Sequence, residues 1–436
     1  MKRSTGSTRP ATVKERFDLE GATAHGGANL LFDYMHRIRL HKAIREELQP
    51  FNKRYNAVYP LASVVELLIG GRVLGLSRIH DFAQVEDDKL LALKVGLAQL
   101  PDSSLLYRDV ARLVDDEALS ALRRISLLPA CRVIGKQVIL DIDSTVETVY
   151  GQLEGAAVGY NPTKHGRASF HPLTFFDGIT RVAIRTELRP GNTVAATGLI
   201  EAFWHAYAEV QKMGATIIAV RADRGFQSEE FFALLEQLGI DYAIKISVNE
   251  KMSTWAADLV FEEFAQYGDE IVEVAEGTYR RASWSQERRV VVVRRRLTEG
   301  VCAGAVYGTQ AIVTALTATP ADVYRFYNQR CGMENMIREA KEGYGIDEFS
   351  SHGYRENYAD LLLKTISYNL GLAFQRELSA LRGAPLQTAR TLRRWLLSIP
   401  ALLVHHSRGY TLRLAVQYRR RGQHERMRAR LKTLAV

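Results

Sequence analysis

Four residues in the last third of the chain have types and a spacing suited to phosphate chemistry: Tyr327, Arg330, Glu334 and Lys341. At about 100° per residue, an α-helix would bring these side chains within roughly 60° of one another, with Arg338 in the same stripe. A carboxylate would then be flanked by cations and a phenol. Guanidinium, ammonium and phenol groups all donate hydrogen bonds to phosphate oxygens. The spacing therefore predicts a helix face that presents an acid among phosphate-binding groups.

Two upstream segments place aspartates at the ends of predicted strands. An apolar run that contains Asp141 and ends at Asp143 predicts a buried β-strand with both carboxylates on one face. Residues 215–221 form a second run rich in β-branched residues, and Asp223 follows it closely. A glycine turn and an amphipathic helix come next, with Ser228 as the expected N-cap. The sequence thus offers strand-end aspartates and one helix-borne glutamate.

Three carboxylates carried by separate elements are the kind of ligand set that divalent cations require. Mg²⁺ prefers oxygen ligands and keeps several waters, so a few carboxylates suffice to hold it. Two such ions about 4 Å apart activate the attacking oxygen and stabilise the leaving oxygen when a phosphodiester is cleaved. Carboxylates packed together are also unstable unless cations neutralise them. Asp143, Asp223 and Glu334 are therefore candidate metal ligands, with Asp141 as the rival to Asp143.

These segments resemble the catalytic segments of bacterial insertion-sequence transposases of the DDE class, in the subclass with the Tyr-Arg-Glu-Lys signature (DDE transposase domain group 1). The resemblance rests on Asp143-Ser-Thr, Asp223-Arg-Gly-Phe and the helix that carries Glu334, and it covers roughly residues 130–380. Two further stretches are similar to that family: Val149-Tyr-Gly-Gln through Gly159-Tyr-Asn-Pro-Thr-Lys-His-Gly, and Arg189-Pro-Gly-Asn-Thr193. Each motif alone is weak, but three in this order on suitable elements are specific.

The resemblance implies a role for each of these residues. Asp143 would bridge two Mg²⁺ ions, with Mn²⁺ as a substitute, and Asp223 and Glu334 would each hold one ion. Asp143 is favoured over Asp141 because a Ser-Thr pair follows it, as in the family. The phenol and the cations would hold the end of the transposon DNA: Tyr327, Arg330, Arg338 and Lys341.

Other residues near these motifs carry separate expectations. Trp284 is a candidate for stacking on an unpaired base near a DNA end, and packing in a core or hairpin is the alternative. Arg224, next to Asp223, is expected to pair with an acid, with DNA as the alternative partner. Glu147 is expected to be a surface acid and Cys331 a buried, reduced thiol.

The net charge of +9 is concentrated at the C-terminus. Residues 386–436 contain 12 Lys and Arg but one acid, Glu425, which gives +11, so the other 385 residues sum to −2. A cluster such as Arg419-Arg-Arg421 suits a polyanion such as the DNA backbone, and a solvated basic tail is the alternative. The three cysteines show no spacing typical of a metal site or a disulfide framework.

The chain has no sequence features of a membrane or secreted protein. No run approaches the roughly 18 apolar residues of a spanning helix, and the N-terminus has no signal-peptide stretch. We therefore expect an intracellular protein without a membrane partner, and the resemblance implies the bacterial cytoplasm and association with the nucleoid. A length of 436 residues allows two or three domains.

The periods of the apolar residues predict an α/β protein in four parts. We expect a flexible basic arm over residues 1–27, a helical domain over 28–130, an α/β catalytic domain over 131–385 with a β-rich insertion over about 250–316, and a basic helical region over 386–436. In the catalytic domain, three strands, helix, strand, helix and strand follow the order of a ribonuclease-H-like core. There the first and fourth strands are neighbours, which would bring the two aspartates together. The resemblance implies that the helical domain binds DNA, with a plain packing module as the alternative.

The same periods give the bounds of individual elements. Predicted helices cover residues 29–48, 60–73, 77–84, 87–96, 103–114, 116–126, 193–213 and 228–238. Predicted core strands cover residues 136–143, 168–176, 180–188, 215–221 and 241–247.

Together these features predict a DNA transposase that cuts the ends of its element and joins them to target DNA. It would bind double-stranded DNA at the terminal inverted repeats and at the target, and act as a homo-oligomer in a synaptic complex. Two alternatives stay open: a ribonuclease-H-like nuclease without strand transfer, and a non-catalytic DNA-binding relative. The three intact acids argue against the second alternative.

Overall fold

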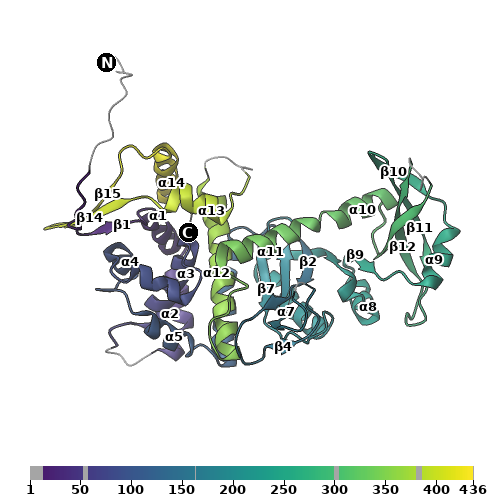
Figure 1. Cartoon of the computed structure of the whole chain (residues 1–436), viewed down its shortest axis with the longest axis horizontal. Coiled ribbons are helices and arrows are strands. Elements are labelled where there is room, and N and C mark those ends of the chain that lie inside the picture. Colours follow the sequence, from purple (N-terminus) through teal and green to yellow (C-terminus); the bar gives the residue numbers. More distant parts are fainter. Residues whose placement is uncertain (1–12, 53–56, 163, 299–303, 380–384, 436) are drawn as a thin grey trace, which may run out of the picture.

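One large mixed β-sheet forms the centre of the protein. The computed structural model describes residues 13–52, 57–162, 164–298, 304–379 and 385–435. The strand order is β10-β11-β12-β13-β9-β8-β2-β6-β7. Figure 1 shows helix α12 (Tyr354–Leu378) standing between this sheet and a helical lobe. The strands of the sheet are β2 (Gln137–Ser144), β6 (Leu173–Asp177), β7 (Ala183–Glu187), β8 (Thr216–Ala222), β9 (Asp241–Ile246), β10 (Glu262–Tyr267), β11 (Glu270–Tyr279), β12 (Arg288–Leu297) and β13 (Val306–Thr314).

The middle of the sheet brings two predicted strand ends to one edge. Strand β2 pairs in parallel with β8, and β8 in parallel with β9, whereas β6 and β7 continue the sheet in antiparallel pairs. Asp141 of β2 is opposite Arg221 of β8. Because the two strands run in the same direction, Asp143 and Asp223 follow at the same edge.

Helices cover both faces of this sheet. Successive side chains of a strand point to opposite faces, so Phe175 packs in one core and Phe176 in another. The core around Phe175 includes α7 (Leu199–Lys212) and α8 (Glu229–Gln237), and the core around Phe176 includes α12. The predicted strands and helices of this region are confirmed, although the strand predicted at 168–176 is divided between β5 (Ala168–Phe170) and β6. Strand β5 belongs to a small separate sheet with β3 (Glu147–Thr148) and β4 (Ala157–Val158).

The region predicted to be a β-rich insertion, about 250–316, contains strands that extend the central sheet. Helix α9 (Glu250–Ala257) precedes β10 to β13, and β13 pairs antiparallel with β9. Every arginine of β12 forms an ion pair. Nε of Arg294 lies 2.7 Å from the carboxylate of Glu273, and Arg288 binds two glutamates of α8. These cations are therefore neutralised by glutamates of the insertion and of α8.

The N-terminal helices share their core with the rest of the chain. Their apolar side chains pack in one continuous cluster with α12 and with C-terminal elements. The helix predicted at 29–48 is divided at Arg39, whose φ of 62° interrupts it. In the described part of the chain, no helix is both long and apolar enough to cross a membrane. The elements are α1 (Ala28–Arg37), α2 (Leu40–Glu47), α3 (Leu61–Leu74), a 3₁₀ helix (Ile79–Val85), α4 (Lys89–Lys94), α5 (Ser103–Val110) and α6 (Asp116–Cys131).

The two ends of the chain differ from the sequence prediction. The region from residue 386, predicted to be helical, also contains an antiparallel hairpin. Part of the predicted arm is ordered, because β1 (Ala22–Thr23) pairs with the hairpin and Gly26 N–H donates to the carbonyl of Ile399 at 2.8 Å. Residues 1–12 of the arm lie outside the described residues. The C-terminal elements are α13 (Ala389–Leu392), a π-helical turn (Arg393–Leu397), β14 (Ala401–His406), β15 (Gly409–Leu414) and α14 (Arg421–Thr433).

A buried charge cluster ties the N-terminal helices to α12. The carboxylate of Asp360 binds the guanidinium of Arg72 from α3, and Nζ of Lys364 lies 2.8 Å from its other oxygen. These residues are at most 2% exposed. One carboxylate therefore neutralises two cations that water does not reach.

Replacing Asp360 with alanine would leave those two buried cations without a carboxylate. We expect Asp360→Ala to lower the free energy of unfolding by about 3–5 kcal/mol, measured by urea denaturation. Asp116→Ala is the control, because it breaks a pair with Arg355 in which Asp116 is 89% exposed, and it should cost no more than about 1 kcal/mol. Equal, small losses would show that the cluster does not hold the helices together.

Candidate active site

Asp143 lies at the end of β2 with its carboxylate largely enclosed. The side chain is 19% exposed, and Oδ1 accepts a hydrogen bond from the backbone N–H of Ser144 at 2.9 Å. Nη2 of Arg330 lies 3.0 Å from the same oxygen and also donates to the carbonyl of Ile142 at 3.3 Å. Arg330 thus supplies the neighbouring positive charge.

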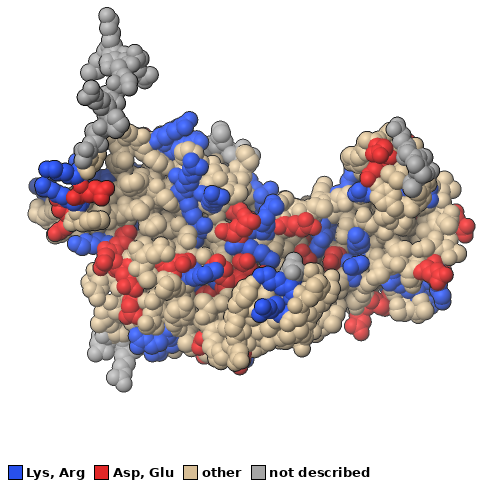
Figure 2. All heavy atoms as spheres, in the orientation of Figure 1, with Lys and Arg blue, Asp and Glu red and all other residues tan. Residues whose placement is uncertain are grey.

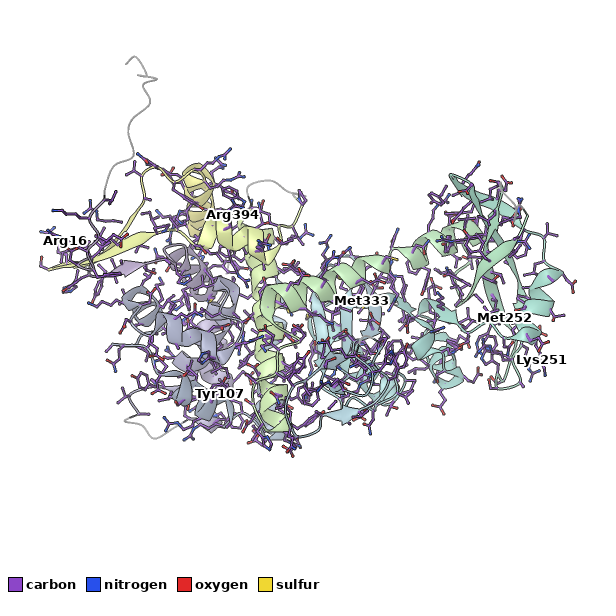
Figure 3. The ribbon with its side chains drawn as sticks, viewed as in Figure 1. Arg16, Tyr107, Lys251, Met252, Met333 and Arg394 are labelled. Atoms are coloured by element: carbon purple, nitrogen blue, oxygen red, sulfur yellow. The ribbon has the colours of Figure 1, made fainter. Side chains whose placement is uncertain are left out.

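The other two predicted acids are close enough to act on the charge of Asp143. Burial raises the pKa of Asp143 to about 6; Arg330 opposes this rise, whereas Asp223 and Glu334 add to it. Asp223 follows β8, and Glu334 is exposed in the first turn of α11 (Cys331–Tyr344). Met333, labelled in Figure 3, is fully buried and anchors that turn. Three acids from three separate elements are therefore brought together.

An open pocket of about 430 Å³ adjoins Asp143 and Glu334. Over the residues that the structure describes, no group of three or more His, Cys, Asp or Glu side chains is arranged to hold a metal ion. The acids are thus neighbours that are not closed around one point. Their chemistry still fits a divalent cation, because they offer oxygen ligands and because a cation would relieve the repulsion that helps to raise the pKa of Asp143.

The Tyr-Arg-Glu-Lys residues do not lie on one continuous helix, so that prediction is wrong. Tyr327 belongs to α10 (Pro320–Asn328), and Arg330 is the N-cap of α11. Between the two helices the backbone forms a 3₁₀-type turn, in which the N–H of Arg330 donates to the carbonyl of Tyr327, three residues earlier, at 2.9 Å. Figure 1 shows the two helices following one another nearly in line. The interruption lets Arg330 turn to β2 while Glu334 faces the pocket.

Tyr327 lies near the acids but is mostly enclosed. It is 8% exposed and packs with Val323 and residues of the insertion. Burial raises its pKa to about 12, and Asp223 and Asp143 contribute to the rise against the effect of Arg330. Within the described residues its hydroxyl has no hydrogen-bond partner, so this group is available to a phosphate oxygen.

Asp141 is fully buried in an ion pair. It accepts two hydrogen bonds from Arg221, from Nε at 2.6 Å and from Nη2 at 2.8 Å. Nη1 of Arg221 donates to the carbonyl of Phe326 at 3.0 Å and to Oε1 of Gln329 at 3.4 Å. One buried pair therefore connects β2, β8 and the junction of α10 and α11, the three elements that carry the predicted acids.

Lys341 and Arg338 both line the pocket, but only Lys341 forms an ion pair with a described residue; Nη2 of Arg338 donates to Oδ1 of Asn335. Nζ of Lys341 donates to Oγ1 of Thr145 at 2.8 Å and lies 2.6 Å from Oε1 of Glu147. Glu147 is 5% exposed, so the expectation of a surface acid is wrong. Lys341 thus holds the segment that follows Asp143. Arg338 is exposed and forms no ion pair with any described residue.

Three further expectations are corrected. Trp284 is 5% exposed and packs edge-on against Phe232, with ring centroids 5.9 Å apart, so it is a core residue and not a surface for a DNA base. Arg224 is exposed and has no ion pair among the described residues, contrary to the expected acid partner. Cys331, expected to be buried, is exposed.

Lys245 is a cation beside the site that the sequence analysis missed. Ala222 of β8 pairs with Ile244 of β9, which places Lys245 beside Asp223. Burial lowers the pKa of Lys245, and the charge of Arg224 adds to this effect. The sequence could have indicated this residue, because Lys245 lies near the end of a predicted buried strand. Neighbouring parallel strands end at the same edge of a sheet, so its side chain was to be expected near Asp223.

Arg281 of the insertion braces the loop that follows Asp223. Nη1 of Arg281 donates to Oε1 of Gln227 at 2.9 Å, and Nη2 contacts the carbonyl of Ser247. Nε2 of Gln227 in turn donates to Oγ of Ser247 at 2.7 Å. No sequence signal marks this contact, because it joins three segments distant in the chain.

The sequence profile described as transposase DDE domain group 1 matches residues 6–436, and the chain therefore belongs to this DDE transposase family. No curated protein matches it by sequence. Among solved structures, the chain is similar to that of a piggyBac transposase synaptic complex with hairpin DNA. That similarity has a TM-score of 0.47 at 13% identity and covers 84% of this chain and 79% of the other.

Asp143→Asn tests the repulsion between the acids without measuring activity. The folded pKa of about 6 lies above the ordinary value of 3.8, so this carboxyl lowers the stability of the fold progressively as the pH rises from about 4 to about 6, and the loss is complete above that. In metal-free buffer at pH 8, we expect the variant to be more stable than the wild type by on the order of 1–3 kcal/mol in urea denaturation. The difference in the free energy of unfolding between the variant and the wild type should shrink as the pH falls from about 6 toward 4. At that pH the carboxyl of folded wild type is protonated and, like the asparagine, carries no charge.

Asp141→Asn is the matched control, two positions earlier on the same strand. It removes the charge of one partner in a buried ion pair and should cost about 3–5 kcal/mol. A loss of similar size for Asp143→Asn at pH 8 would contradict the repulsion.

Proposed function

We propose that the protein is a DNA transposase that cuts the ends of its element and joins them to target DNA. Hydrolysis frees a 3′-hydroxyl at each end, and transesterification joins that hydroxyl to the target. The observation that carries the proposal is the electrostatic coupling of Asp143 with Asp223 and Glu334 beside an open pocket. The strand order β7-β6-β2-β8-β9, with α7 between β7 and β8, supports the predicted ribonuclease-H-like core.

In this proposal, Asp143, Asp223 and Glu334 hold two Mg²⁺ ions, with Mn²⁺ as a substitute. When bound, such ions activate the attacking oxygen and stabilise the leaving oxygen. Arg330 keeps the carboxylate of Asp143 oriented through its contact at 3.0 Å. The Asp141–Arg221 pair below it keeps the three acid-bearing elements in register.

Two of the proposed DNA-binding residues, Arg338 and Lys341, line this pocket, and Tyr327 lies near Asp143 and Asp223. Arg338 has no ion pair with a described residue, although its Nη2 donates to Oδ1 of Asn335, so its positive charge is available to phosphate oxygens, and Tyr327 offers a hydroxyl. Lys341 serves by positioning the chain beside Asp143, and its ammonium also borders the pocket. Double-stranded DNA, as terminal inverted repeats and as target, is the substrate we propose, and a homo-oligomer is the expected synaptic form.

Glu334→Gln tests the catalytic assignment. The substitution keeps size and removes one negative ligand, so cleavage of element ends should fall by at least about 1,000-fold with DNA affinity retained. Gel assays of cleavage and of binding measure the two quantities. Glu250→Gln is the control, since Glu250 also lies in the first turn of a helix but is exposed in the insertion. Normal cleavage by the Glu334 variant would refute the assignment.

A strand-transfer assay with precut element ends distinguishes a transposase from a nuclease. Supplied with ends that already carry a 3′-hydroxyl, the protein should join them to a target plasmid in the presence of Mg²⁺, and Asp223→Asn should abolish the joined product. Shortened ends without joined product would instead identify a nuclease. Metal-independent function that survives the acid substitutions would identify a non-catalytic DNA-binding protein.

A further inference from the structure

The structure sorts the C-terminal cations into paired and unpaired groups. Arg421 pairs with Glu425 at 2.7 Å, and Arg428 binds Asp33. Arg393 is enclosed and donates to backbone carbonyls of α3, and Nη1 of Arg430 donates to the carbonyl of Ser379 at 2.7 Å. The remaining side chains have neither an ion pair nor a hydrogen bond among the described residues: Arg390, Arg394, Arg408, Arg413, Arg419, Arg420, Arg426 and Lys432. The positive charge of this region is therefore mostly unneutralised.

Two of these arginines form cation–π contacts with the same indole ring, that of Trp395. The guanidinium carbon of Arg394 lies 5.1 Å from the ring centroid of Trp395, and that of Arg420 lies 5.0 Å from it. Both arginines are exposed, and Arg419 is exposed beside them. Arg394, Trp395, Arg419 and Arg420 are called the Trp395 surface below. Like charges gathered in this way, without a carboxylate, favour an anionic partner.

Hydrogen bonds fix the position of this surface. The hydroxyl of Tyr418 donates to the carbonyl of Trp395, which holds the segment with Arg420 against the π-helical turn. On the other side of the turn, Nε of Arg393 donates to the carbonyl of Val73 at 2.9 Å. The arginines thus extend from a backbone anchored to the core.

The Trp395 surface lies near the end of the helix that carries Glu334. Arg393 contacts the carbonyl of Gly343 in α11, and Gly343 is nine residues after Glu334, or about 14 Å along the helix. Figure 3 shows Arg394 near the upper end of α12, and Figure 2 shows blue side chains gathered over this region. That distance corresponds to about four base pairs of duplex, at roughly 3.4 Å each.

We propose that the Trp395 surface binds the phosphate backbone of duplex DNA that extends beyond the catalytic pocket. This proposal rests on the proposed function for the identity of the polyanion. Exposed guanidinium groups bind phosphate oxygens in pairs, and such contacts position a duplex without reading its sequence. The surface accordingly contributes affinity and placement for any sequence.

The salt dependence of DNA binding tests the surface directly. The full chain is titrated with a 40-base-pair duplex in metal-free buffer between 50 and 200 mM salt. In the double variant Arg394→Gln/Arg420→Gln, we expect the slope of log K against log[salt] to become shallower by about two and affinity at low salt to fall by about tenfold or more. Arg421→Gln is the matched control, because Arg421 is adjacent in sequence but already pairs with Glu425; its slope should change by less than half as much.

An unchanged slope and affinity in the double variant, with an unchanged urea midpoint, would overturn the proposal. Weaker binding to vesicles of anionic lipid with normal DNA binding would also overturn it, since the surface would then take a membrane. Arg420→Glu is a second variant, in which the new carboxylate can pair with Arg394, and it should weaken DNA binding further. The salt titration measures DNA binding and not cleavage. A negative result for the Trp395 surface therefore leaves the Glu334→Gln test of catalysis unaffected, and a negative result for Glu334→Gln leaves the titration unaffected.

Discussion

The ion pair between Asp141 and Arg221 is the constraint on which the candidate site depends. Both side chains are at most 1% exposed, and the pair connects β2, β8 and the junction of α10 and α11. A buried ion pair is weak evidence for stability, because apolar residues of similar volume often serve as well. A bidentate pair has a defined geometry, however. It therefore sets the register of two strands and the position of a helix junction, so that acids distant in sequence keep fixed relative positions.

The same geometry holds like charges together, and the neighbouring cations only partly offset them. Arg221 is neutralised by Asp141, and Lys341 by Glu147, so Arg330 is the cation paired with Asp143. Repulsion and burial consequently keep the pKa of Asp143 near 6. Such strain lowers stability, and folds commonly accept it where function requires a particular arrangement. In this protein a divalent cation bound by the carboxylate oxygens would relieve the repulsion between the acids.

The sequence predicted the parts of this arrangement that local patterns determine. Buried strands that end in aspartates and their spacing identified Asp143 and Asp223, and helical spacing placed Glu334 on α11. Patterns could not show the break before Arg330, because its backbone remains in the helical region and the periodicity continues through it. Nor could they show pairing across distant segments. The ion pairs that the arginines of β12 form with glutamates of other elements depend on tertiary contacts, and so does the burial of Trp284.

An acidic pocket repels the polyanion on which it would act, so affinity for DNA has to come from other surfaces. The insertion is poorly suited to this, since the cations of β12 are neutralised. The C-terminal region has the opposite character, with unpaired arginines fixed at the far end of α11. A helix is a stiff element, so a duplex held at one end of α11 is also placed relative to Glu334 near the other end. Binding energy gained away from the reacting phosphate can then offset the cost of bringing that phosphate to the acids.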